Sequence, residues 1–357
     1  MIRAVSHVRA MAPYALADLG DATMISLAQN ESAFPVSPKA VEAGQVALTT
    51  APQYPDPDWR VLRSAIAGAY RVPQSGILCG AGSMELIGCL IRSFAGHGDQ
   101  VLGTEYGYLF VASATAQAGA EYVTVPEPDF TVSIDLILES VTPTTRIVFV
   151  CNPGNPTGTT LPNAELIRLR EALPSDVMLV IDQAYGEFDT QDPKAIFALV
   201  RRGDTVVTRT FSKAYGMAGA RVGWGLFPEA IGGEMRKLLN PNNISGVTQA
   251  MAAAAVGDQA HMQATVDGTA AIRNEFVLRL RALGLRIPDS HTNFVLVPFE
   301  SKAAAQAANT ALRAEGLLLR GMGGYGLGHC LRATIGSATV MAQLADTLEH
   351  HLGGGHE

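Results

Sequence analysis

The sequence contains no apolar run long enough to cross a bilayer, and its first residues lack the uninterrupted apolar core of a signal peptide. Its four cysteines, Cys79, Cys89, Cys151 and Cys330, show no metal-ligand spacing, and three lie beside or within apolar segments, which predicts buried free thiols. Basic residues are fewer than acidic ones, and the net charge is -7. We therefore expect a cytoplasmic protein with no membrane segment, no metal site and no nucleic-acid partner.

The 357 residues, 48% of them apolar, suffice for about two globular domains. Short apolar runs alternate with helical patterns through the middle of the chain, which predicts a mostly parallel sheet covered by helices. We expect a three-layer α/β/α large domain over residues 51–260, a smaller α/β C-terminal domain over 261–357, and an N-terminal arm over 1–50 that closes over the site. The predicted strands are 101–104, 146–150, 177–181 and 205–208, and the predicted helices are 84–94, 163–173, 193–200 and 249–283, the last interrupted near 257–258.

Two segments at the ends of predicted strands carry the chemistry. Asp182 and Tyr185 follow one strand, and Lys213 and Arg221 follow another. Pyridoxal phosphate requires these groups from a protein: a lysine for the Schiff base, an acid for the pyridine nitrogen, a phenol for the ring hydroxyl and an arginine for the phosphate. A carboxylate buried without a cationic partner would be costly, and a protonated pyridine supplies that partner. The lysine would also move protons during the reaction.

A glycine turn is expected to hold the phosphate. Gly80-Ala81-Gly82-Ser83 follows an apolar run and opens a helix, so backbone N–H groups there can approach an anion. A dinucleotide site would need a third glycine where Glu85 stands, and is not expected. The same phosphate could be contacted by Thr210, Ser212 and Arg221.

Other side chains complete the predicted site. Asn155, in a rigid turn rich in Pro and Gly, can donate to the ring oxygen of the cofactor. Tyr106 follows a predicted strand and would either stack on the pyridine ring or be an ordinary rim tyrosine. Arg320 and Arg332 flank a Gly-rich loop, and arginine suits the paired oxygens of carboxylate or phosphate.

With these residues assembled, the sequence resembles the fold-type I pyridoxal-phosphate aminotransferases, specifically the histidinol-phosphate aminotransferase branch. The resemblance covers nearly the whole chain. The wider superfamily is marked by Asn155-Pro156-Thr157-Gly158, Asp182 with Tyr185, and Ser212-Lys213 with Arg221, and the branch by Tyr54-Pro55-Asp56-Pro57, Tyr106-Gly107 and Arg320 with Gly324-Tyr325-Gly326-Leu327.

The resemblance implies a role for each residue. Lys213, Asp182 and Tyr185 would be catalytic, and Arg332, Arg320, Asn30 and Tyr14 would contact the substrate. It also implies a homodimer with a shared active site, in which Tyr54 reaches the phosphate of the partner subunit. The implied cofactor ligands are Gly82, Ser83, Met84 (through its backbone N–H), Tyr106, Asn155, Asp182, Tyr185, Thr210, Ser212, Lys213, Arg221 and Tyr54.

The implied reaction is ping-pong transamination between glutamate and 2-oxoglutarate on one side and histidinol phosphate (imidazole acetol phosphate) or an aromatic amino acid on the other. Two alternatives remain open from the sequence. Lyases that resemble threonine-phosphate decarboxylase share these residues and would release carbon dioxide. A non-catalytic, pyridoxal-binding regulatory domain is the other, and the presence of both Lys213 and Asp182 disfavours it.

Overall fold

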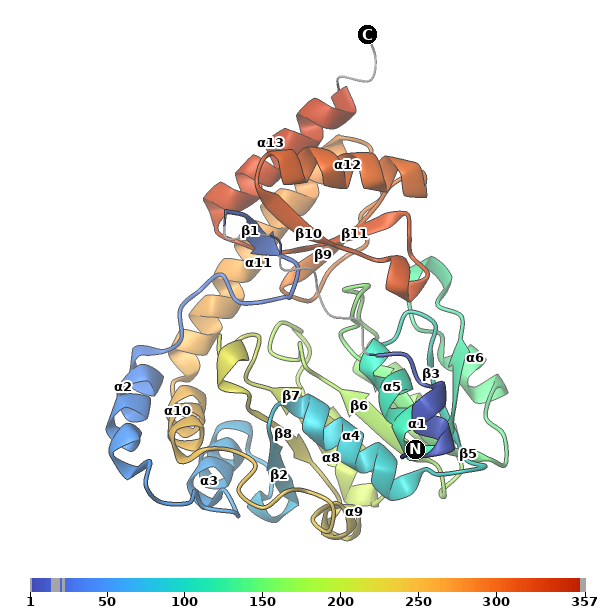
Figure 1. Ribbon diagram of the computed structural model, residues 1–357, viewed down its shortest axis with the longest axis vertical. Coiled ribbons are helices and arrows are strands. Elements are labelled where there is room, and N and C mark those ends of the chain that lie inside the picture. Colours follow the sequence, from blue (N-terminus) through green and yellow to red (C-terminus); the bar gives the residue numbers. More distant parts are fainter. Residues whose placement is uncertain (1, 14–19, 21–22, 354–357) are drawn as a thin grey trace.

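The computed structural model of the chain describes residues 2–13, 20 and 23–353, which form two β-sheets (Figure 1). The large sheet has the strand order β2-β8-β7-β6-β5-β3-β4. In it, β8 pairs antiparallel with β2 and β7, and the other neighbours pair in parallel. Its strands are β2 (Ile77–Gly80), β3 (Gln100–Thr104), β4 (Glu121–Val125), β5 (Thr145–Cys151), β6 (Met178–Asp182), β7 (Thr205–Thr210) and β8 (Gly223–Leu226).

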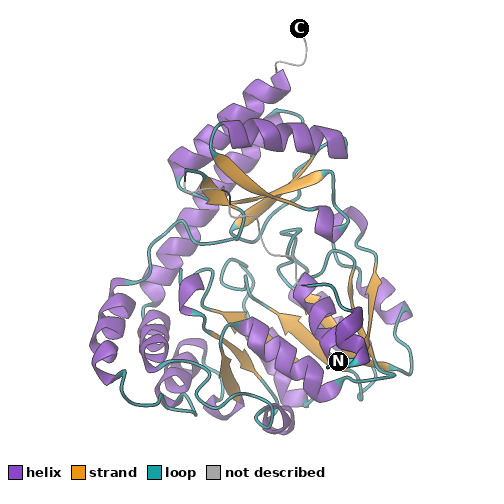
Figure 2. Cartoon of the chain, in the orientation of Figure 1, coloured by secondary structure: helices purple, strands orange, loops and turns teal. Residues whose placement is uncertain are grey.

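Helices cover both faces of the large sheet. Every residue of β2, β3, β6, β7 and β8 is buried, as expected for the strands of a sheet that lies between two helical layers. The predicted three-layer α/β/α fold is therefore confirmed (Figure 2). The helices of this part are α1 (Ser6–Ala10), α2 (Pro38–Ala47), α3 (Arg60–Tyr70), α4 (Ser83–Phe94), α5 (Leu109–Ala118), α6 (Ile134–Glu139), α7 (Asn163–Ala172), α8 (Lys194–Leu199), α9 (Glu229–Met235) and α10 (Gly246–Gly257).

The small sheet has the order β1-β10-β11-β9 and its own apolar core. The first strand comes from the predicted N-terminal arm and pairs in parallel with β10. Figure 1 shows the long helix α11 running from beside α10 up to this sheet. The elements are β1 (Ile25–Leu27), β9 (Phe294–Pro298), β10 (Leu317–Gly321), β11 (Cys330–Thr334), α11 (Gln259–Ala282), α12 (Lys302–Ala314) and α13 (Ala338–Gly353).

The predicted break in the long helical pattern is confirmed, because α10 ends at Gly257 and α11 begins at Gln259. The domain limits 50/51 and 260/261 stay predictions, although this break lies beside the second.

The four cysteines are buried free thiols, as expected. Short 3-10 turns occur at Leu48–Thr50, Gln74–Gly76, Pro128–Phe130, Val200–Arg202, Ala218–Ala220 and Gly323–Tyr325.

The described residues contain neither a membrane-spanning helix nor a cluster of metal-ligating side chains. None of the helices they form is long and apolar enough to cross a membrane. In the same ranges, no group of three or more His, Cys, Asp or Glu side chains could hold a metal ion.

Candidate active site

A cavity of about 450 Å³ lies at the carboxyl ends of the parallel strands, where it also contacts β10 and β11 of the small sheet. This edge of an open α/β sheet is where ligands bind. Most of the residues predicted for the site line this cavity. They include residues predicted to contact the cofactor and residues predicted to contact the substrate. They are Asn30, Gly82, Ser83, Met84, Asn155, Asp182, Tyr185, Thr210, Ser212, Lys213, Arg221, Arg320 and Arg332.

Lys213 enters the cavity from the loop after β7. Its Nζ donates to the backbone oxygens of Asn30, at 2.9 Å, and Gln29, at 3.2 Å. The pKa of Lys213 is lowered to about 7, first because the side chain is buried and second because the Arg332 guanidinium lies nearby. A large fraction of this amine is therefore uncharged at neutral pH, which is the form that attacks a carbonyl.

Asp182 ends β6 and is 2% exposed. Its Oδ1 accepts a hydrogen bond from Thr208 Oγ1 at 2.7 Å. Burial raises the pKa of Asp182 to about 6, while Thr208 and the backbone N–H of Ala184 act in the opposite direction. Because a carboxylate in such a place needs a cationic partner, the residue fits a protonated ring nitrogen placed in the cavity.

The turn Gly80–Ser83 before α4 provides one end of the cavity. Gly82 is the N-cap of this helix and has a φ of +82°, which favours glycine. A Cβ at Gly82 would lie 2.8 Å from Arg221 Nη2, and a Cβ at Gly223 would overlap the backbone nitrogen of Ser83. The guanidinium and β8 therefore lie directly against this turn.

Hydroxyl groups complete this end of the cavity. Thr210 Oγ1 donates to Ser212 Oγ at 2.9 Å and accepts from the Ser212 backbone N–H at 3.1 Å. Gly82 offers no side-chain cap, so the first N–H groups of α4 are available to a ligand. Together with Arg221, which lines the same cavity, this donor set fits a phosphate group.

The opposite wall is a network of amides and one phenol. Arg332 Nη1 donates to Asn155 Oδ1 at 2.7 Å, so the Asn155 amino group is the donor left to face the cavity. Asn30 Nδ2 donates to Tyr185 Oη at 2.8 Å. Burial raises the pKa of Tyr185, which keeps its proton available for donation. Two donors, Asn155 and Tyr185, are thus suited to one ring oxygen.

Arg320 and Arg332 lie directly opposite each other in the antiparallel pair β10–β11. Side chains of such a pair project from the same face, and both line the cavity. Arg332 is 6% exposed, donates to the backbone oxygen of Ala28 at 2.9 Å and lies 5.2 Å from the Phe294 ring. Arg320 is half-buried. The two guanidiniums form a site for an anion.

The expectation for Tyr106 requires a correction. Tyr106 does not line the cavity: its ring packs 6.1 Å from that of Phe130 in an apolar cluster, and its backbone N–H donates to Glu127 at 3.0 Å. Tyr108, two residues later, lines the cavity instead. The chain turns at Gly107, so spacing alone could not tell which tyrosine faces the ligand.

Two other predicted residues lie elsewhere. Tyr54 is 88% exposed and does not line the cavity. Tyr14 lies outside the described residues. Sequence reasoning missed Tyr108, Cys151 and Tyr325 as cavity residues, although Cys151 begins the turn that holds Asn155. Its position at the carboxyl end of the buried strand β5 was the signal that could have identified it.

Known proteins are similar to this chain over most of its length. The family model "Aminotransferase class I and II" matches residues 22–348. A histidinol-phosphate aminotransferase of Paramagnetospirillum magneticum is 42% identical over 92% of each chain. That of Hyphomonas neptunium is 40% identical over 98% of this chain and 96% of the relative. A histidinol-phosphate aminotransferase of Sinorhizobium meliloti, solved in complex with pyridoxal-5'-phosphate, superimposes with a TM-score of 0.86 at 28% identity, covering 92% of this chain and 91% of that one.

Proposed function

The chain belongs to the aminotransferase class I and II family, and on this basis we propose that it is a pyridoxal-phosphate-dependent enzyme of histidine biosynthesis. It transfers an amino group between glutamate and imidazole acetol phosphate, giving 2-oxoglutarate and histidinol phosphate. The observation that carries this proposal is the joint placement of Lys213, Asp182 and an arginine pair around one cavity. Relatives about 40% identical over nearly the whole chain carry the corresponding name.

The bound cofactor supplies an aldehyde that takes up the amino group and a ring that accepts electrons. Asp182 would keep the ring nitrogen protonated, Asn155 and Tyr185 would donate to the ring oxygen, and Tyr108 would lie beside the ring. The phosphate ligands are Gly82, Ser83, Met84, Thr210, Ser212 and Arg221, all of which line the same cavity.

Lys213 has two tasks in this proposal. It would hold the cofactor through Nζ, and the same Nζ, when free, would take up a proton and return it. The backbone oxygens of Gln29 and Asn30 orient the amine through hydrogen bonds. A pKa near 7 suits both tasks, because neither protonation state is then strongly favoured at neutral pH.

The pH dependence of cofactor capture tests this property of Lys213. Because the pKa of Lys213 is about 7, the uncharged fraction falls about tenfold per pH unit below 7 and is nearly constant above about 8. We expect the rate at which the apoprotein binds pyridoxal covalently to follow this curve in stopped-flow absorbance. Pyridoxal is used because it has no phosphate that titrates in the same range. A rate that keeps rising to about pH 10, as for an ordinary lysine, would contradict the assignment.

Arg320 and Arg332 bind the anionic end of both substrates. Glutamate presents a carboxylate and histidinol phosphate a dianionic phosphate, so the second guanidinium matters more for the phosphate. Asn30 comes from the N-terminal segment, donates a hydrogen bond to Tyr185 and lines the same cavity as the two arginines. Tyr14 belongs to the arm that we propose closes over the substrate.

Replacing Arg320 with glutamine tests the substrate. We expect the KM for histidinol phosphate to rise about tenfold or more and the KM for glutamate to rise less, since a charge-assisted hydrogen bond is lost mainly to the dianion. Both values come from single half-reactions followed by cofactor absorbance. Arg313→Gln, on α12, is the control and should change neither. Phenylalanine reacting faster than histidinol phosphate in the unmodified enzyme would instead identify an aromatic aminotransferase.

The enzyme acts as a homodimer in the cytoplasm in this proposal, and Tyr54 reaches the phosphate site of the partner subunit. In support, large apolar side chains are exposed along one stretch of the chain, which is typical of an interface. They are Val41, Val46, Leu48, Tyr54 and Val61. A fully active monomer would refute this arrangement.

A further inference from the structure

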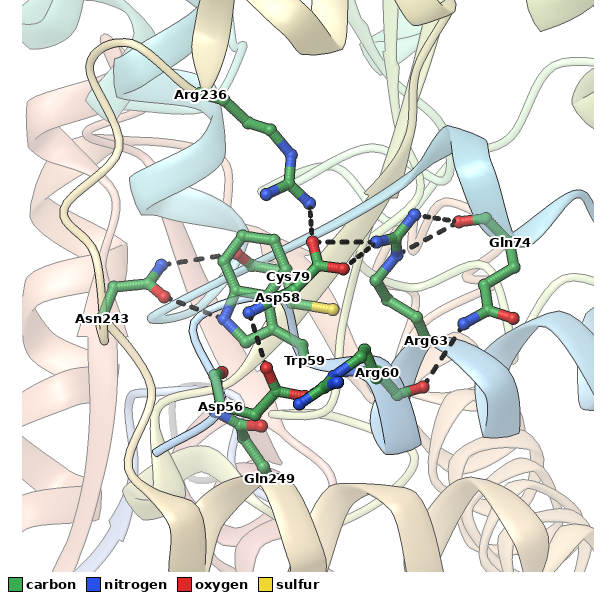
Figure 3. Close-up of polar contacts among 10 residues, drawn as sticks. All are labelled: Asp56, Asp58, Trp59, Arg60, Arg63, Gln74, Cys79, Arg236, Asn243 and Gln249. Carbon is green, nitrogen blue, oxygen red and sulfur yellow. Dashed lines mark hydrogen bonds and ion pairs between the residues drawn. The ribbon is translucent and has the colours of Figure 1, made fainter. Parts of the chain in front are cut away.

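A polar cluster beside the cavity joins three segments that lie far apart in the sequence (Figure 3). Asn243, in the loop between α9 and α10, lies at one edge of this cluster. The indole Nε1 of Trp59 donates to Asn243 Oδ1 at 3.0 Å. The Asn243 Nδ2 donates to the backbone oxygen of Cys79 at 3.3 Å and to Glu85 Oε2 at 2.7 Å. One side-chain amide therefore connects α3, β2 and α4.

The chemistry of its partners fixes which way this amide points. An indole N–H can only donate, so it must meet the oxygen of Asn243. A carboxylate and a carbonyl oxygen accept here, so they must meet the amino group. Aspartate at this position would keep the bond to Trp59 and place a second carboxylate against Glu85.

Glu85 extends the connection to the turn that holds the phosphate. Its Oε2 also accepts from the backbone N–H of Ala81 at 2.6 Å. Ala81 lies between Gly80 and Gly82, and the backbone N–H of Gly82 donates to the backbone oxygen of Gly80 at 2.7 Å. Ser83 follows as the first residue of α4. Glu85 thus holds the turn without lining the cavity itself.

At its other end, the cluster holds the segment that carries Tyr54. Trp59 is 2% exposed and has a φ of 50°, and the Arg236 guanidinium lies 5.0 Å from its ring. Asp58, the preceding residue, pairs with Arg63 at 3.0 Å and with Arg236. Tyr54 is five residues before Trp59 and is exposed.

We propose that Asn243 and Glu85 are positioning residues for the cofactor phosphate, and that they connect the phosphate-binding turn to the Tyr54 segment of the same subunit. This inference rests on the proposed function, because it assumes that the turn binds pyridoxal phosphate. A negative charge near a helix N-terminus competes with a phosphate for the same N–H groups. Asn243 prevents this competition by holding the Glu85 carboxylate on the Ala81 N–H.

The test is the dissociation constant of pyridoxal phosphate, measured by equilibrium dialysis of the full-length apoprotein. Asn243→Ala is expected to weaken binding about tenfold, since it releases a charged hydrogen-bond partner. Adding Glu85→Gln to that variant should restore the constant to within about threefold, because a neutral amide competes less with phosphate. Gln249→Ala is the matched control. The Gln249 side-chain amide donates to the backbone oxygens of Asp56 and Ile244. It has no hydrogen bond to the turn among the described residues, so its loss should change the dissociation constant less than about twofold.

Asn243→Asp provides a second variant if the alanine protein does not fold. It keeps the acceptor for Trp59, should weaken binding at least as much as Asn243→Ala, and should be rescued by the same Glu85→Gln change. Melting temperatures of the apoproteins are measured alongside, since a purely structural role would lower them without a rescue of cofactor affinity by Glu85→Gln.

The outcomes separate this inference from the function on which it rests. If the unmodified protein does not bind pyridoxal phosphate, the proposed function is wrong. If it binds and Asn243→Ala binds equally well, or if Glu85→Gln does not rescue the loss, the positioning role is overturned.

The proposed connection between the phosphate-binding turn and the Tyr54 segment is measured by hydrogen exchange of the backbone amides in residues 52–60. At saturating pyridoxal phosphate, exchange should slow in the unmodified protein and in Tyr54→Phe, but not in Asn243→Ala. Equal slowing in Asn243→Ala would show that the segment responds to the cofactor by another route and would refute the connection.

Discussion

Replacing Lys213 with alanine is expected to lower kcat by at least about 10⁴-fold, the upper range for a positioned proton-transfer group. The variant loses both the amine that attaches the cofactor and the one that moves the proton. No other lysine lines the cavity in the described part of the chain. The fold should persist, because the Lys213 amine donates to the backbone oxygens of Gln29 and Asn30, and both oxygens remain at the cavity edge in the variant. Steady-state kinetics and thermal melting measure the two effects.

Borohydride reduction followed by mass spectrometry gives a second readout for this variant. The unmodified protein should gain the mass of one cofactor on Lys213, and Lys213→Ala should gain none. Lys237→Ala is the control, since Lys237 is exposed on the surface and pairs with Glu234. Added methylamine should restore part of the proton-transfer rate to Lys213→Ala. Attachment of the cofactor to a different lysine would refute the assignment.

Asp182→Asn is expected to reduce kcat about 10³-fold while leaving cofactor binding largely intact. A neutral amide cannot stabilise a protonated ring nitrogen, and electrostatic stabilisation of this kind contributes about 10²–10³-fold or more to a rate. The phosphate ligands and Lys213 remain in place. Single-turnover kinetics with glutamate measure the loss, and a variant within tenfold of the unmodified rate would contradict the role of Asp182.

Asp182→Asn lowers kcat, but it should not lower the stability of the apoprotein at neutral pH. Because burial raises the pKa of Asp182 from 3.8 to about 6, ionisation of this group disfavours the folded state. Its contribution to stability therefore falls as the pH rises from about 4 to above 6. Apo Asp182→Asn should be at least as stable as the unmodified apoprotein at neutral pH and lose this advantage below about pH 4. Lower stability of the variant at neutral pH would contradict this sign.

The local sequence was sufficient for the parts of the site that follow strands. Asp182 could be predicted because it ends an apolar strand, and Lys213 because it lies three residues after the end of the next strand. The carboxyl ends of parallel strands meet at one edge of the sheet. The helices α4 and α7 began and ended close to the predicted residues for the same reason: their apolar periodicity and flanking glycine or proline are local signals.

Features that depend on distant partners could not be predicted in this way. The strand β1 pairs with β10, nearly the length of the chain away, and three consecutive leucines at the start of β10 do not distinguish a strand from the end of the preceding helix. The choice between Tyr106 and Tyr108 depends on Phe130 and the loop after β10, which enclose the first ring. The contact of Asn243 with Glu85 joins residues 158 positions apart, and no local pattern indicates it.

The most direct test of the proposed transamination is a half-reaction titration of the purified holoprotein followed by absorbance. Glutamate should convert the cofactor to its amino form with one 2-oxoglutarate released per site, and imidazole acetol phosphate should then restore the original spectrum and yield histidinol phosphate. No carbon dioxide should be released. Carbon dioxide release without formation of the amino form, or a spectrum that does not respond to glutamate, would contradict a ping-pong aminotransferase.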